Sequence, residues 1–176
     1  MEVLVVVAIF STAMVAVTDM FLIANRAERK VLGREQLAST ARVAVEQIAR
    51  GVRQGSVDYA RYADPAGGGP LAPADTRLFL RGADGGTFAF RRSESDCPPG
   101  SSPCLLVEEN GETASLTPTG AVVEQFTVII NPTVDPFERL PDGTYPSDAQ
   151  PTVTVVLALR SGSGASAANV RVQTTV

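Results

Sequence analysis

Residues 1–23 read MEVLVVVAIFSTAMVAVTDMFLI, an apolar stretch whose only charges are Glu2 and Asp19. As an α-helix with a rise of about 1.5 Å per residue, this stretch spans the roughly 30 Å hydrocarbon core of a bilayer. A cleaved secretory signal would start with basic residues and end with small residues at a cleavage site, and this stretch has neither. The sequence therefore predicts a membrane helix that is retained.

The position of Glu2 at the start of this helix requires a physical explanation. A carboxylate placed in hydrocarbon costs about 2.5–3.5 kcal/mol, and more when it is isolated. Either the acid belongs to an ordinary signal anchor and lies among the lipid headgroups, or a positive group of another molecule neutralises it. The second explanation makes Glu2 a candidate assembly residue, because the charge is tolerated only when the two molecules are in register.

The helical pattern continues past the apolar stretch, and no proline occurs before Pro65. Apolar residues recur at helical spacing on one side of this continuation, whereas charged residues occupy the other side. The apolar side consists of Leu37, Ala41, Val45, Ile48 and Val52, and the charged side of Arg42, Glu46, Arg50 and Arg53. We expect one helix from about Val3 to about Arg53, roughly 75 Å long, that Gly33 and Gly51 weaken locally.

The rest of the chain has the pattern of an antiparallel sheet. Gly82–Gly86 and Asn110-Gly111 each separate two strand-like segments, which is typical of β-hairpins. The fold class is therefore expected to be α+β, with the long N-terminal helix packed on a mostly antiparallel β-sheet head. The expected strands are 76–81, 87–91, 104–108, 113–117, 122–130, 152–159 and 170–176, and the expected loops are 57–75, 131–151 and 161–168.

Two regions follow from this pattern. Residues 1–56 should form the N-terminal helix, with a membrane part at 1–24 and an amphipathic part at 25–56. Residues 57–176 should form one β-rich globular head, since about 120 residues suffice for a single hydrophobic core. The net charge of −4 and the isoelectric point near 4.9 disfavour nucleic acid as a partner. The basic residues after the apolar stretch are suited to phospholipid headgroups instead.

Cys97 and Cys104 are the only cysteines, and they enclose a turn-rich loop, Pro-Pro-Gly-Ser-Ser-Pro. This spacing favours a local disulfide, which in turn favours an oxidising compartment. The alternatives are two buried free thiols or redox chemistry, although redox motifs have two residues between their cysteines. With no histidine in 176 residues, two thiols leave a zinc ion short of ligands.

The usual catalytic motifs are missing, since the chain has neither a Gly-x-Ser-x-Gly elbow nor a phosphate-binding glycine loop followed by lysine. We therefore expect no enzyme, and no cofactor. Acidic residues gather in the expected 131–151 loop, where carboxylate oxygens could hold calcium. The weak calcium candidates are Asp135, Asp142 and Asp148, with Glu138 nearby. Their spacing matches no known calcium loop, and the alternative is a solvated, proline-stiffened loop that contacts another subunit or a partner.

Residues 1–11, MEVLVVVAIFS, resemble the N-terminal segment of the type IV pilin and type II secretion pseudopilin superfamily, whose Gly-Phe-Thr-Leu-x-Glu type signal is cut after the glycine. Residues 41–55 resemble the helix ending of the J-type minor pseudopilins and related minor pilins. The segments 153–159 and 170–176, joined by a Gly-Ser loop, look like the last two strands of those proteins. This resemblance covers the helix strongly and the head weakly.

The resemblance implies that Glu2 pairs with the free terminal amine of a neighbouring subunit during assembly. It also implies a basic leader before residue 1, prepilin peptidase to remove it, methylation of the new terminus, and an assembly platform. Small residues at Ala8, Ser11, Ala13 and Ala16 should let neighbouring helices approach closely. The side chains expected in the filament core are Val3, Leu4, Val7, Ile9, Phe10 and Val15.

These patterns predict a non-enzymatic pilin-like subunit, of minor type, in a type IV pilus or a type II secretion pseudopilus. It would cross the inner membrane once with its head outside the cytoplasm, and later enter a filament with other pilin or pseudopilin subunits. The basic residues 26–34 oppose this orientation, because the positive-inside tendency places such residues in the cytoplasm. A leader that decides orientation before its removal would resolve the conflict. The alternatives are a signal-anchored, monomeric surface binding module and an enzyme with an unfamiliar site.

Overall fold

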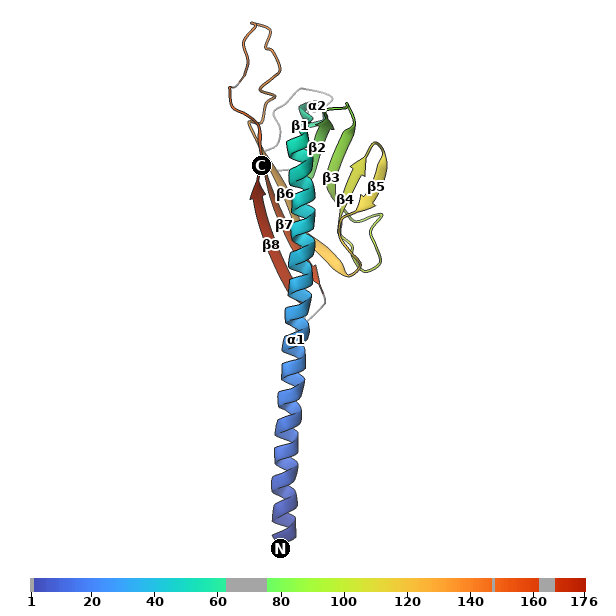
Figure 1. The fold of residues 1–176 in the computed structure, drawn as a ribbon, viewed down its shortest axis with the longest axis vertical. Helices are drawn as coiled ribbons and strands as arrows, with labels where there is room; N and C mark the ends of the chain where they lie inside the picture. Colours follow the sequence, from blue (N-terminus) through green and yellow to red (C-terminus); the bar gives the residue numbers. More distant parts are fainter. Residues whose placement is uncertain (1, 63–75, 147, 162–166) are drawn as a thin grey trace.

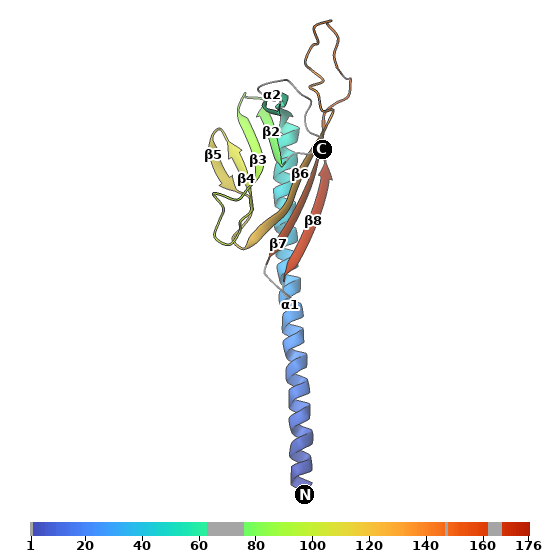
Figure 2. The same ribbon diagram turned by 180° about the vertical axis from the view of Figure 1, so that it is seen from behind.

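The computed structural model describes residues 2–62, 76–146, 148–161 and 167–176, and it has the α+β architecture (Figure 1). A single long helix carries two antiparallel sheets on its second half, while its first half extends away from them (Figures 1 and 2). In chain order the elements are α1 (Glu2–Gln54), β1 (Gly55–Val57), α2 (Tyr59–Tyr62), β2 (Arg77–Gly82), β3 (Thr87–Ser93), β4 (Cys104–Glu109), β5 (Glu112–Ser115), β6 (Ala121–Asn131), β7 (Thr152–Ser161) and β8 (Ala168–Thr175).

The helix α1 confirms the single helix expected from the sequence, and its 53 residues extend about 80 Å. It passes through Gly51 without a break because this residue lies against the sheet: an added Cβ would come within 3.2 Å of Leu80 Cδ1. Gly55 ends the helix, since a Cβ there would lie 2.7 Å from the Arg81 carbonyl oxygen. The absence of a side chain lets the chain turn directly into β1.

The expected apolar stripe of α1 is confirmed as its buried face. Ile48 and Ala41 are fully buried, and the charged residues on the opposite side are exposed. One hydrophobic core joins this face to both sheets, so the second half of α1 and the head fold as one unit. From the helix this core takes Leu37, Ala41, Ala44, Val45 and Ile48; from the sheets it takes Leu78, Leu80, Phe90, Leu105, Val123, Phe126, Val128, Ile130, Val153, Val155, Leu157 and Leu159, among others.

The head contains two sheets, whereas the sequence suggested one. The first has the strand order β1-β2-β3-β4-β5 and the second β6-β7-β8, and every pairing is antiparallel. The two sheets meet at Val123 of β6, whose backbone N–H donates to the Pro103 carbonyl at 2.7 Å and whose carbonyl accepts from Arg92 Nε at 3.1 Å. Strand β6 therefore contacts the first sheet near its start but belongs to the second sheet. Alternation of apolar and polar residues within a strand does not encode this choice of partner.

Both expected hairpins are present. The β2–β3 turn is closed by a hydrogen bond from Gly82 N to Gly86 O at 2.8 Å. The β4–β5 turn places Asn110 and Gly111 at φ values of 51° and 90°, as a two-residue hairpin with positive φ at both positions requires. The sequence chemistry of these turns thus fixes the pairing of neighbouring strands.

The expected loop at 57–75 is wrong at its start, because β1 ends at Val57 and α2 follows it. Strand β1 has only three residues, too few to show alternation, and it forms by pairing with β2. The short helix α2 is stabilised by contacts with β2, since the Tyr62 hydroxyl donates to Arg77 O at 3.1 Å and accepts from Phe79 N at 2.8 Å. Residues 63–75 lie outside the described part of the chain.

The connection from β6 to β7 projects beyond the head at the end opposite the N-terminus (Figures 1 and 2). We call residues 132–151 the distal loop; Ser147 lies outside the described part. Its base is tied to α2, because the Tyr59 hydroxyl donates to Pro132 O at 3.0 Å. Its tip is closed by the hydrogen bonds Leu140 N to Thr144 O and Gly143 N to Leu140 O, both 2.8 Å.

Replacing Ile48 by alanine should lower the free energy of unfolding of the head by about 2–5 kcal/mol, because Ile48 is fully buried in the core shared by α1 and both sheets. Denaturant unfolding of the full chain in detergent micelles measures the change. The matched control is Val43→Ala on the exposed side of the same helix, where a change under about 0.5 kcal/mol is expected. Equal losses for the two variants would contradict the assigned core.

Candidate functional site

The N-terminal part of α1, residues 3–23, which we call the apolar half, is exposed along its described length. The large apolar side chains described there have exposed fractions of 46–76 %. Within the described part of the chain, α1 is the one helix that is long and apolar enough to cross a membrane. The exposed side chains are Val3, Val5, Val6, Val7, Ile9, Phe10, Met14, Val15, Val17, Met20, Phe21, Leu22 and Ile23.

This exposure is large compared with the stability of a folded domain. Covering these thirteen side chains would contribute on the order of 20 kcal/mol, whereas a domain is stable by about 5–15 kcal/mol. Soluble monomers rarely expose apolar patches of more than a few hundred Å². The apolar half therefore requires a cover of lipid or of other protein chains.

Of the filament-core residues expected from the sequence, Val3, Val7, Ile9, Phe10 and Val15 are exposed on the apolar half. They are spread around the helix, so each can contact lipid or a neighbouring helix.

Glu2 and Leu4 belong to α1, but their side chains lie outside the described part, as does that of Ala8. The assembly role of Glu2 stays a prediction.

The hydroxyl groups of the apolar half are satisfied within the helix itself. Ser11 Oγ donates to Val7 O at 2.7 Å, and Thr18 Oγ1 donates to Met14 O at 2.8 Å. Thr12 Oγ1 likewise donates to Ile9 O at 2.8 Å. Because these donors already have acceptors, the helix can enter lipid or a helix bundle without leaving these hydroxyl donors unpaired.

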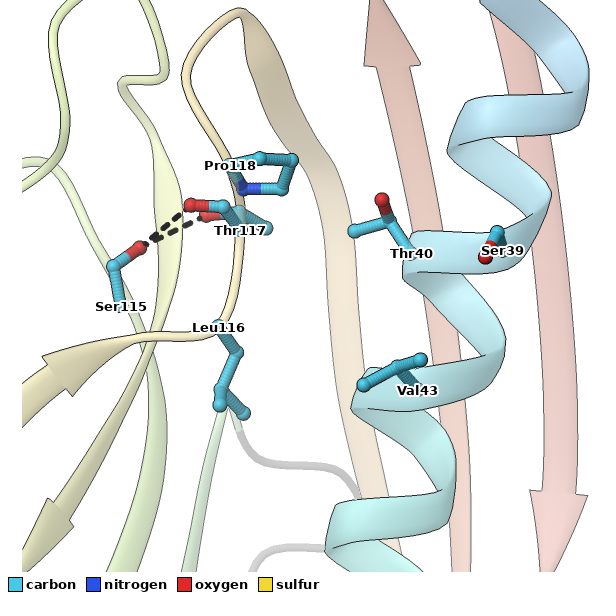
Figure 3. Close-up of a pocket in the computed structure, with 7 residues that line it drawn as sticks. All are labelled: Ser39, Thr40, Val43, Ser115, Leu116, Thr117 and Pro118. Carbon is cyan, nitrogen blue, oxygen red and sulfur yellow. Dashed lines mark hydrogen bonds between the residues drawn. The ribbon is translucent and has the colours of Figure 1, made fainter.

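A groove of about 340 Å³ runs beside the exposed face of α1 at the level of the head (Figure 3). Ser39, Thr40 and Val43 of α1 form one wall, and residues 115–118, the end of β5 and the start of its connection to β6, form the other. The second wall is fixed by hydrogen bonds, since Ser115 Oγ donates to Thr117 O at 2.9 Å, and Leu105 N donates to Thr117 Oγ1 at 3.3 Å.

The groove offers small, hydroxyl-bearing and aliphatic side chains and no titratable group among its lining residues. Its chemistry suits contact with another apolar element rather than catalysis. A second hollow of about 380 Å³, lined in part by Ala38, Ser39 and Val43, adjoins it on α1. Sequence reasoning missed this groove, because it depends on where residues 115–118 lie relative to the helix.

Another hollow of about 380 Å³ lies between the C-terminal end of α1 and the first sheet. Phe88, Phe90 and Val107 supply apolar surface there, and Arg50 and Glu109 are among the charged lining residues. Its volume falls within the range of small-molecule sites, about 300–1,000 Å³. No local pattern in the sequence indicates this hollow either, since its residues come from α1, from strands β1, β2, β3 and β4 and from the β2–β3 turn.

Cys97 and Cys104 form the expected disulfide, with Cα atoms 5.6 Å apart. Cys104 is fully buried at the start of β4, and Cys97 lies in the connection between β3 and β4, four residues after Ser93. The bond therefore closes the β3–β4 connection at its base. Neither cysteine lines the groove, and because the bond ties the β3–β4 connection to the start of β4, we expect it to stabilise the head.

Replacing both cysteines by serine should lower the free energy of unfolding by about 2–3 kcal/mol, the loop-closure value for so short a loop. Denaturant unfolding of the full chain, with and without reductant, measures this loss. Reductant should destabilise the native chain and leave the double variant unchanged. A double variant as stable as the oxidised native chain would contradict a stabilising role.

The calcium candidates are not brought together. Asp135 Oδ1 accepts from Phe137 N at 2.9 Å, and Asp142 Oδ1 accepts from the Thr144 hydroxyl at 2.6 Å and its N–H at 2.9 Å. The Thr144 hydroxyl, and then its N–H, lower the pKa of Asp142. Among the described residues no three carboxylate, thiol or imidazole groups lie close enough to hold a metal ion. Asp135, Asp142 and Asp148 therefore do not form such a group, and two of them accept hydrogen bonds in turns of the distal loop.

The Tyr59 hydroxyl, beneath the distal loop, should make the free energy of unfolding depend on pH in the alkaline range. Burial is the main cause that raises its pKa above the ordinary value of 10.0, and the Asp135 carboxylate adds to it. The pKa of Tyr59 is higher in the folded chain than in the unfolded chain. The contribution of its neutral hydroxyl to stability is therefore fully present below about pH 10 and is lost as pH rises through the pKa of the folded chain.

Tyr59→Phe should remove this alkaline dependence and cost about 0.5–1.5 kcal/mol at neutral pH, the worth of its hydrogen bond to Pro132 O. Tyrosinate absorbance during a pH titration, together with unfolding at each pH, tests this. Tyr145→Phe, in the exposed part of the distal loop, is the control. Ionisation of Tyr59 at or below the pKa of free tyrosine would contradict the burial.

Comparisons of this chain with protein-family models, with curated proteins and with solved structures find no match.

Proposed function

We propose that this chain is a pilin-like filament subunit that assembles through the apolar half of α1. The observation that carries this proposal is the continuity of α1. One uninterrupted helix is built into the core of the head over Leu37–Ile48, and its described side chains over Val3–Ile23 are exposed. A rigid rod of this kind transmits the position of its apolar half directly to the head, which a flexible anchor would not do.

Before assembly the apolar half lies in the membrane, and during assembly it moves into a bundle of the same helices from other copies. Lipid and helix surfaces are equally apolar, so this transfer gains little from the hydrophobic effect. Close packing of the helices and pairing of polar groups must therefore supply the free energy that favours the bundle over the membrane. The small residues Ser11, Ala13 and Ala16 permit close packing, and they are exposed on the helix.

Polar pairing is the role proposed for Glu2, the first residue of α1. The terminal amine of a neighbouring subunit would neutralise its carboxylate, and a copy out of register would leave the charge unpaired at several kcal/mol. The same acid thus disfavours a wrong position and favours the right one. Leucine at this position would suit the membrane better and the filament worse.

The proposed subunit is non-enzymatic and of minor type, in a type IV pilus or a type II secretion pseudopilus. Its partners would be other pilin or pseudopilin subunits, with prepilin peptidase and an assembly platform acting before and during assembly. The head would lie outside the cytoplasm, first at the inner membrane and then in the periplasm or at the cell surface. The disulfide supports this side, because an oxidising compartment maintains such bonds.

Glu2→Leu should leave the amount of membrane-inserted chain unchanged and lower its incorporation into filaments about tenfold, a loss of about 1.4 kcal/mol of pairing. Immunoblots of membrane and sheared-filament fractions measure both quantities. The control is Glu112→Leu, an exposed acid of β5 that lines none of the hollows described above, which should incorporate normally. Normal incorporation of the Glu2 variant would contradict the pairing.

A second candidate function is a monomeric, membrane-anchored binding module. The hollow lined by Phe88, Phe90 and Val107 favours it, because a small ligand would fit there. Cysteines placed at Val7 and Ala16 distinguish the two functions. Adducts between copies in sheared filaments support assembly, whereas monomers in every fraction support the anchored module.

A further inference from the structure

The distal loop exposes apolar side chains at the end of the molecule farthest from the N-terminus (Figures 1 and 2). Phe137 and Tyr145 are 70 % and 57 % exposed, and Val134 and Leu140 are also exposed. Phe137 and Tyr145 line a cavity of about 630 Å³ together with Asp148 and neighbouring residues. Aromatic side chains held in an ordered loop, outside the core, are typical of a contact surface.

The same loop is strongly acidic. Residues 132–151 contain four acids and one base, a net charge of −3. The base, Arg139, donates through Nε to Gly143 O at 2.9 Å and so belongs to the loop's own turn. A partner of this surface should therefore combine apolar side chains with a positive charge. The acids are Asp135, Glu138, Asp142 and Asp148.

A surface with these properties exists at the other end of the head. Residues 26–34 of α1, which we call the basic segment, contain four bases and one acid, a net charge of +3. Val31 and Leu32 within it are 56 % and 59 % exposed. The bases Arg26, Arg29, Lys30 and Arg34 are all exposed. The two surfaces thus have equal and opposite charge, and each presents uncovered apolar side chains.

The two surfaces of one chain cannot meet. Lys30 and Gln54 are separated along α1 by 24 residues, about 36 Å, and the distal loop projects beyond Gln54. The complementary surface must therefore come from a second molecule.

We propose that the distal loop of one copy of this chain docks on the basic segment of a second copy, displaced along the helix axis. Phe137 and Tyr145 would cover Val31 and Leu32, and the acids of the loop would face the bases of the segment. This inference rests on the proposed filament function, since an axial displacement of copies is what a filament supplies.

The displacement has a consequence for the apolar half. When the second copy is displaced along the helix axis by 24 residues or more, about 36 Å, its apolar half lies at the same height as the head of the first copy. There it passes the height of the groove between α1 and residues 115–118. One docking contact thus brings the exposed helix of the upper copy alongside the uncovered face of α1 in the lower copy.

Cross-linking between two differently tagged copies tests the docking. One full-length copy carries Ala149→Cys in the distal loop and the other Ala27→Cys in the basic segment, both exposed positions with small side chains. A short bismaleimide should join them in filament fractions. Adducts at Ala16→Cys, prepared in parallel, report on helix assembly independently.

Charge reversal then tests the cause of the contact. Glu138→Arg with Asp148→Arg, or Arg29→Glu with Arg34→Glu, should lower the adduct yield about tenfold, and all four changes together should restore it. The matched control, Glu109→Arg with Glu112→Arg on the β4–β5 hairpin, has the same change in charge and should keep the native yield. Yields of the native pair should fall at high salt.

Adducts that follow this pattern of loss and rescue support the docking. Adducts at Ala16 without loop adducts would overturn the docking and leave the filament function standing. The absence of both would overturn both. A third outcome would also overturn the docking: Arg29→Glu with Arg34→Glu lowers the adduct yield, and adding Glu138→Arg with Asp148→Arg does not restore it. Lipid headgroups would then be the partner of the basic segment.

Discussion

The whole arrangement depends on one constraint: α1 is a single rigid helix, and its two halves have different surroundings. Over Leu37–Ile48 its apolar side faces a core made by two sheets, and over Val3–Ile23 every described large side chain is exposed. The core fixes the second half firmly, so the first half cannot fold back onto the head. A cover must come from outside the chain. In the function that we propose, lipid covers the apolar half of a single molecule, and other copies cover it in a filament.

Local chemistry of the sequence predicts much of this fold. The spacing of Leu37, Ala41, Val45 and Ile48 indicates the buried face of α1, because a helix repeats every 3.6 residues and only one side can reach a core. Asn110-Gly111 predicts its hairpin, since both residues tolerate positive φ. The paired cysteines around a short turn predict the disulfide. In each case the signal and the structure depend on residues close together in the chain.

The remaining features depend on contacts between distant residues. The division into two sheets is made where Val123 pairs with Pro103, and strand β1 exists because Gly55 approaches Arg81 closely. The groove beside Val43 is formed by a connection more than seventy residues away. The weak calcium candidates differ from these features, because Asp135 and Asp142 accept hydrogen bonds from residues only two positions along the chain, inside their own turns. Charge and apolar character, by contrast, could be read directly, and they identify the two ends that we infer to meet.

The central claim is that the apolar half exchanges lipid for sister helices. Electron spin resonance of a nitroxide attached at Val15→Cys tests it most directly, because helices in a bundle pack with their axes about 8–10 Å apart. In sheared filaments we predict strong dipolar coupling between labels, which weakens when labelled chains are diluted with unlabelled ones. In membranes before assembly we predict no coupling. Uncoupled, lipid-accessible labels in every fraction would contradict the account.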